Sequence, residues 1–79
     1  MNIFILKSMR YLDNTELFTK DEMWENAYDA WAADAADAAA AVATYAVAAA
    51  ARAEYWIDEY FRITEEDKQD YINEVERLK

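Results

Sequence analysis

Carboxylates are the side chains in this sequence that are best placed to do chemistry. Glu25 and Asp29 form one pair with a spacing of i, i+4, and Glu54 and Asp58 form another. On a helix each pair would share one face, as metal-binding carboxylates do. Di-iron helical sites also need histidine, which the sequence lacks, and a calcium-binding EF-hand loop needs a glycine, which is also absent. We therefore expect a solvated acidic surface with no metal ion and no cofactor.

Catalytic chemistry is disfavoured by the same residue types. A carboxylate pair becomes an acid–base catalyst when burial raises the pKa of one member, and every candidate here falls on a polar face. Cysteine and histidine are absent, which excludes disulfides, thiolate metal sites and histidine catalysis. Glycine-rich phosphate loops are excluded too, because there is no glycine. The sequence predicts a protein that is not an enzyme.

The composition indicates an all-α fold in a single domain over residues 1–79. Glycine and proline are both absent, whereas β-rich folds need turns that favour glycine or asparagine. A chain of 79 residues buries too little surface to be very stable alone. Without disulfides, dense helix packing or oligomerisation must compensate.

A short helix is predicted at each end of the chain. The first covers about residues 2–12, although the run Ile3–Leu6 would also suit a strand. Helix is preferred because a single strand would have no partner. The other covers about residues 65–78, after a capping box formed by Thr64 and Asp67.

One long central helix is predicted over about residues 20–63. Thr19 and Glu22 form a capping box at its start, and Phe18 and Met23 hold the positions of a hydrophobic staple. Alanine is the best helix former, and no glycine or proline interrupts the segment. Such a helix would be a rod about 65 Å long.

This predicted rod has two faces when each residue is turned about 100° from the last. Bulky apolar side chains share one face: Trp24, Tyr28, Trp31, Val42, Tyr45, Trp56, Tyr60 and Ile63. Carboxylates form an opposite acidic face that suits a basic partner: Glu22, Glu25, Asp29, Asp37, Glu54 and Asp58. The aromatic residues gather near both ends, where the short helices can cover them, so we interpret them mainly as core. Some of them could instead anchor a binding interface.

The middle of the apolar face is nearly all alanine, and the short helices cannot reach it. Small side chains let two helices approach to about 8 Å. We therefore expect an antiparallel homodimer with a two-fold interface. Its predicted contact residues are Ala35, Ala38, Val42, Tyr45 and Ala49. The alternative is an exposed alanine surface that water tolerates.

The formal net charge of −9 disfavours direct binding to nucleic acid or an anionic membrane and suits a basic partner. Lys7 and Arg10 follow the first apolar residues, the reverse of a signal peptide. The uncharged stretch Ala38–Ala51 is too short and too weakly apolar to span a bilayer. These features favour a soluble cytoplasmic protein.

Three segments resemble small alanine-rich proteins of tailed bacteriophages: the opening FILKSMRYLD of Phe4–Asp13, the alanine tract, and the closing YWIDEYF of Tyr55–Phe61. The resemblance covers most of the chain. That family has no assigned activity, so no residue role is carried over. The resemblance implies an accessory protein in a bacterial host cytoplasm, where such proteins often bind and block a host enzyme or defence factor.

Three functions are consistent with these observations. The first is a non-enzymatic protein that binds and inhibits or modulates a host protein. The second is an acidic nucleic-acid mimic that blocks a DNA- or RNA-binding host enzyme, although Ala38–Ala53 leaves a gap without acids in the rod. The third is a structural or assembly role for the long helix.

Overall fold

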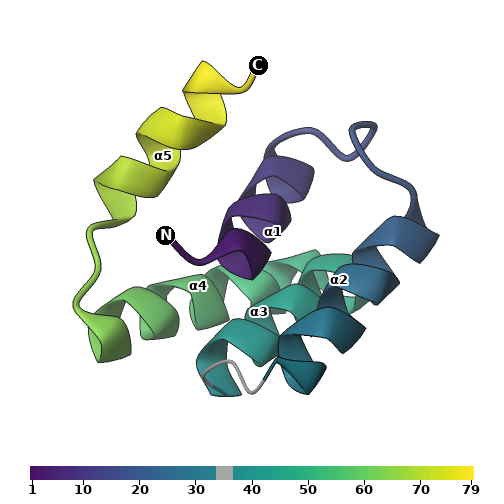
Figure 1. The fold of residues 1–79 in the computed structure, drawn as a ribbon, viewed down its shortest axis with the longest axis horizontal. Coiled ribbons are helices and arrows are strands. Elements are labelled where there is room, and N and C mark those ends of the chain that lie inside the picture. Colours follow the sequence, from purple (N-terminus) through teal and green to yellow (C-terminus); the bar gives the residue numbers. More distant parts are fainter. Residues whose placement is uncertain (34–36) are drawn as a thin grey trace.

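The computed structural model describes residues 1–33 and 37–79, and every regular element in these ranges is an α-helix (Figure 1). The helices are α1 (Ile3–Asp13), α2 (Lys20–Ala32), α3 (Asp37–Ala48), α4 (Ala50–Thr64) and α5 (Lys68–Arg77). The all-α prediction is confirmed. The opening run Ile3–Leu6 lies within α1, so its helical interpretation is the correct one.

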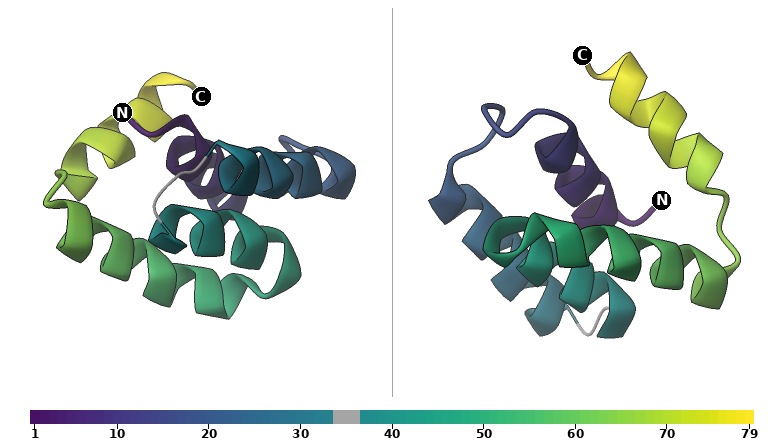
Figure 2. Two further views of the ribbon diagram at one scale, coloured as in Figure 1. Left: turned by 60° about the horizontal axis from the view of Figure 1, so that its bottom comes forward. Right: turned by 180° about the vertical axis from the view of Figure 1, so that it is seen from behind.

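The single helix predicted over residues 20–63 is wrong, because the segment contains three separate helices. Figure 2 shows α3 lying between α2 and α4. At the second break Ala49 is extended, with φ −158° and ψ 85°. Its N–H still donates to the carbonyl of Tyr45 at 2.8 Å, and its carbonyl accepts from the N–H of Arg52 at 2.9 Å. One residue therefore reverses the chain with few unpaired backbone groups.

Tertiary packing explains why the chain folds back without a glycine or proline. Helix propensity differs between ordinary residues by less than about 0.7 kcal/mol, so burial of an apolar face outweighs it. The helix that gains most is α3, which packs on α1, α2 and α4. Its buried residues are Ala38, Ala39, Ala40, Val42, Ala43 and Ala46. The alanine-rich segment is thus the centre of the core.

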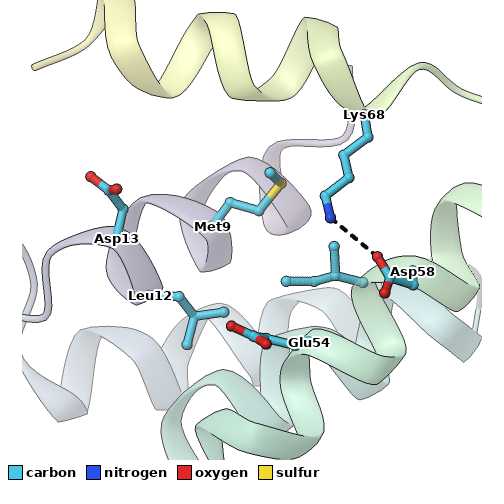
Figure 3. A pocket seen from close by; sticks show the side chains of 7 residues that line it. Met9, Leu12, Asp13, Glu54, Asp58 and Lys68 are labelled. Atoms are coloured by element: carbon cyan, nitrogen blue, oxygen red, sulfur yellow. Dashed lines mark hydrogen bonds and ion pairs between the residues drawn. The ribbon is translucent and has the colours of Figure 1, made fainter.

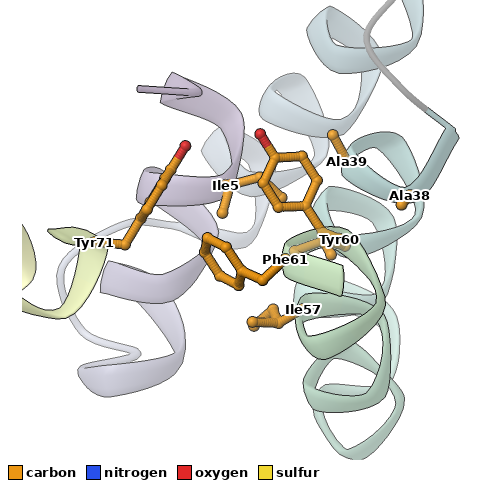
Figure 4. Close-up of a cluster of buried hydrophobic side chains, with 8 residues drawn as sticks. Ile5, Ala38, Ala39, Ile57, Tyr60, Phe61 and Tyr71 are labelled. Atoms are coloured by element: carbon orange, nitrogen blue, oxygen red, sulfur yellow. The ribbon is translucent and has the colours of Figure 1, made fainter. Parts of the chain in front are cut away.

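Two larger clusters of apolar side chains complete the core around α3. In one, Phe61 meets the rings of Tyr60 and Tyr71 edge to face, at 5.2 and 4.9 Å between centroids (Figure 4). In the other, Met23 packs with Tyr11 and small residues of α3 and α4. Because Tyr71 is the buried aromatic of α5, the first cluster also fixes the C-terminal helix.

The start of α2 is the capping box that the sequence predicts. The hydroxyl of Thr19 accepts from the N–H of Glu22 at 3.1 Å, and the Glu22 carboxylate accepts from the N–H of Thr19 at 2.9 Å. The second predicted box is wrong. Thr64 is the last residue of α4, and Asp67 is itself the N-cap of α5, accepting from the N–H of Gln69 at 2.8 Å.

A polar clasp joins α4, α5 and the N-terminal segment. Its centre is Glu66, whose carboxylate accepts from the hydroxyl of Tyr60 and, at 2.6 Å, from that of Tyr71. The Tyr71 hydroxyl in turn accepts from the N–H of Asn2 at 2.7 Å. Glu65, in the left-handed region at φ 60°, ends α4 so that Glu66 can turn back. The carboxylate therefore joins Tyr60 and Tyr71 directly and is connected to Asn2 through the Tyr71 hydroxyl.

Acid is expected to weaken the fold through Glu66. Burial raises the pKa of this carboxyl, but hydrogen bonds from Tyr60 and Tyr71 outweigh it and hold the pKa below its ordinary 4.5. The resulting stabilisation is complete above pH 4.5 and is lost as the pH falls through the lowered folded value. Urea denaturation on both sides of pH 4.5 should show a smaller acid loss for Glu66→Gln than for the wild type. An equal pH dependence in both proteins would contradict the prediction.

Candidate protein-binding surface

The alanine stripe predicted as a dimer interface is largely covered by the chain itself. Ala38 and Val42 are buried against neighbouring helices, and Tyr45 stacks on Trp56 with 6.5 Å between ring centroids. Ala49 is half-buried at the α3–α4 turn, and Ala35 lies outside the described residues. The described residues therefore leave no continuous alanine face for the predicted antiparallel pairing. The cause is the folding back of α2 and α4 onto α3.

The predicted acidic face is not one surface either, although all six carboxylates are exposed. Glu22, Glu25 and Asp29 belong to α2, whereas Glu54 and Asp58 belong to α4, on the other side of α3 (Figure 2). The sixth acid, Asp37, begins α3. Splitting the rod into three helices has separated the acids that a continuous helix would align.

Glu54 and Asp58 border a hollow of about 350 Å³ between α1 and α4 (Figure 3). Its other lining residues include Asp13 and Lys68, over a partly apolar floor. The ammonium of Lys68 lies 3.1 Å from Asp58 and neutralises it. Among the described residues no group of three potential metal ligands is close enough to hold an ion. Glu54 and Asp58 thus line a surface hollow in which Asp58 is ion-paired with Lys68.

The main unexpected surface is an aromatic stripe on α2, made of Trp24, Tyr28 and Trp31. Their exposed fractions are 41%, 74% and 57%. Spacings of i, i+4 and i+7 place the three rings on one helix face. The interpretation of these residues as core is therefore wrong, while the same interpretation is correct for Tyr60 at the other end of the predicted rod, which is buried.

A different face of α2 enters the core. It is formed by Met23, Asn26, Ala27 and Ala30. Ala27 and Ala30 pack against Ala40 and Ala43 of α3. Small side chains on both helices fit this contact, whereas an indole would force the helices apart. The run of alanines facing α2 is thus the sequence signal that identifies which stripe is buried.

The stripe is held in place from its α3 side. The indole N–H of Trp31 donates to the hydroxyl of Thr44 at 3.0 Å, and that hydroxyl donates to the carbonyl of Ala40 at 2.9 Å. A hollow of about 150 Å³ lies among Trp24, Ala27, Tyr28, Trp31 and Thr44. Because the hydrogen bond already orients Trp31, binding of a ligand would cost less conformational entropy of this side chain.

Replacing Thr44 by valine should release Trp31 without unfolding the protein. The change removes the two hydrogen bonds of the Thr44 hydroxyl, but valine keeps the shape of the side chain and the Ala40 carbonyl retains its helical partner, so we expect a stability loss of about 1 kcal/mol. The indole N–H resonance of Trp31 should shift in an NMR spectrum, while that of Trp56 stays in place. Thr15→Val, in the loop before α2, is the matched control. An unchanged Trp31 resonance would show that the hydrogen bond is not formed.

Comparison of the chain with protein-family models, curated proteins and solved structures finds no match. No helix in the described part of the chain is long and apolar enough to cross a membrane.

Proposed function

We propose that this protein is not an enzyme and acts by binding another protein through the aromatic stripe of α2. The observation that carries the proposal is the exposure of Trp24, Tyr28 and Trp31 on one face of a helix. Tryptophan and tyrosine dominate the energetically important positions of protein interfaces. Contiguous exposed apolar groups on a soluble protein commonly mark such interfaces.

The geometry of the stripe suits recognition by secondary structure. Anchors at i, i+4 and i+7 are the pattern by which an amphipathic helix is received in a groove or along another helix. The hollow beside Thr44 gives the partner a place to insert a side chain. The orientation of the Trp31 anchor is fixed by its hydrogen bond to Thr44.

The partner that we propose is a host protein, whose activity this protein inhibits or modulates. The support is the resemblance of the chain's flanks to phage accessory proteins, and the corresponding site of action is the bacterial cytoplasm. Nucleic-acid mimicry has less support, because α3 separates the acids of α2 from those of α4. A homo-oligomer and an assembly role are further proposals, but neither needs the aromatic stripe.

Removing the stripe should abolish capture of the partner. We expect the wild type to retain a specific protein from bacterial lysate, and Trp24→Ala/Tyr28→Ala/Trp31→Ala to bind it at least about 100-fold more weakly, since each central aromatic contributes roughly 2 kcal/mol. Alanine preserves the helix, which circular dichroism would check.

Tyr55→Ala/Ile63→Ala is the matched control, since both residues are exposed and apolar but belong to α4. It should bind like the wild type. Undiminished capture by the triple variant would contradict the proposal, as would an equal loss in the control. A complex that survives high salt would also rule out mimicry, whose contacts are charge pairs.

A further inference from the structure

A row of exposed carboxylates runs beside the aromatic stripe. Asp21, Glu25 and Asp29 succeed one another at i, i+4 spacing and are exposed. Asp21 is three residues before Trp24, and Glu25 is three before Tyr28, so acids and rings are neighbours on the helix surface. None of the three carboxylates forms an ion pair or a side-chain hydrogen bond with another described residue.

Many carboxylates elsewhere in the described chain do have such partners. Glu59 and Glu74 pair with arginines one turn along their own helices, Asp58 pairs with Lys68, and Glu66 holds the clasp. Within the described chain, cations also lie over aromatic rings. Lys7 and Arg10 lie over Phe18, and Arg52 lies over Tyr45, at 4.9 to 5.9 Å from the ring centroids. No such cation lies over a ring of the described stripe.

We propose that the stripe and its acidic row receive an amphipathic segment of a partner protein that carries arginine beside its apolar residues. This inference rests on the proposed function and names the chemistry of the partner. A guanidinium can stack on the face of Trp24 or Tyr28 and direct its N–H groups to a carboxylate on the next turn. Apolar side chains of the same segment would fill the hollow beside Trp31 and Thr44.

The negative charge of α2 favours an arginine-bearing segment over a second copy of the chain as the binding partner. The helix carries four carboxylates and one lysine. Two copies that met along α2 would bring these acids together, and like charges across an interface are unfavourable. The net charge of −9 also repels nucleic acid. A basic protein segment instead pairs with both the acids and the rings.

Two synthetic peptides test the inference. One is an amphipathic helix with leucine along one stripe and arginine along the next, and the other replaces each arginine by citrulline, which has the same shape and no charge. We expect saturable binding of the arginine peptide, with shifts of the indole resonances of Trp24 and Trp31 and not of Trp56. The citrulline peptide should bind at least about tenfold more weakly.

Charge variants of the protein distinguish a local site from general attraction to an acidic molecule. Glu25→Gln/Asp29→Asn should weaken the arginine peptide at least about tenfold and leave the citrulline peptide unchanged. Glu16→Gln/Glu65→Gln alters the net charge equally at exposed positions outside α2 and should change affinity less than about twofold.

Equal binding of the two peptides through Trp24 and Trp31 would overturn the arginine inference while leaving the proposed function intact. Failure of both peptides to bind saturably would overturn it as well, as would an equal loss in the two charge variants. The proposed function fails separately, if the triple aromatic variant still captures the partner from lysate.

Discussion

Replacing Ala40 by glutamate is expected to unfold the protein at neutral pH. Ala40 is 0% exposed and packs with Ala27, Ala30 and the ring of Phe4. A carboxylate there would be buried without a cation, at a cost of several kcal/mol. Small domains are stable by roughly 5 kcal/mol or little more, so the loss would consume most of the stability. Far-UV circular dichroism and urea denaturation would measure it.

The substitution Ala40→Glu also distinguishes the observed fold from one continuous helix. Glu22, Ala40 and Asp58 follow one another at intervals of about five helical turns, so on a rod Ala40 would face solvent in line with both acids. Glutamate would then be harmless. Ala51→Glu is the control, because Ala51 is exposed in the first turn of α4, where a negative charge suits the helix dipole.

Ala51→Glu should therefore change stability by no more than about 0.5 kcal/mol. The milder Ala40→Leu keeps the site apolar but overfills it, and should cost about 1–3 kcal/mol. Native stability of Ala40→Glu would be incompatible with the packing of α2 on α3.

Removal of the Glu66 carboxylate is the second large perturbation. Tyr60 and Tyr71 are each 2% exposed, and both hydroxyls donate to this one group. In Glu66→Ala both donors lose their acceptor, and each lost hydrogen bond costs about 1–2 kcal/mol where water does not replace it fully. We expect a total loss of about 2–4 kcal/mol in the free energy of unfolding, measured with urea.

Two variants define the origin of that loss. Glu66→Gln keeps one acceptor oxygen and should fall between the wild type and Glu66→Ala. Glu65→Gln alters the neighbouring carboxylate, which is exposed, and should be nearly silent. A loss below about 0.5 kcal/mol in Glu66→Ala would show that the tyrosines do not depend on the clasp.

Features that depend on adjacent residues could be predicted from the sequence. The box of Thr19 and Glu22 is complete within four residues, so its residue types determine the start of α2. The helical content follows from alanine and from the absence of glycine and proline. The break at Ala49 has no such local signal, because a neighbouring alanine would be equally helical. It is determined by what α3 and α4 bury when they meet.

The exposed face of α2 could not be predicted from local sequence either. Along α2 both Met23 with Ala27 and Trp24 with Tyr28 satisfy a helical apolar pattern, and the pattern alone favours the bulkier set. The choice is made by the alanines of α3, whose small surface accepts small partners at short range. The clasp could not be predicted either, since Asn2 and Tyr71 become neighbours only through the packing of α5 on α1.

The alanine centre of the core has a consequence for how the protein tolerates mutation. Alanine has no side-chain rotamers to immobilise, so α3 is buried at almost no cost in side-chain entropy. Most cores are damaged by truncation, which leaves cavities. Along the buried face of α3 there is little to truncate, and nearly every substitution enlarges the side chain. A saturation scan of the buried alanines of this helix should therefore show the reverse of the usual pattern, with glycine and serine the mildest replacements and large aliphatic residues among the most harmful.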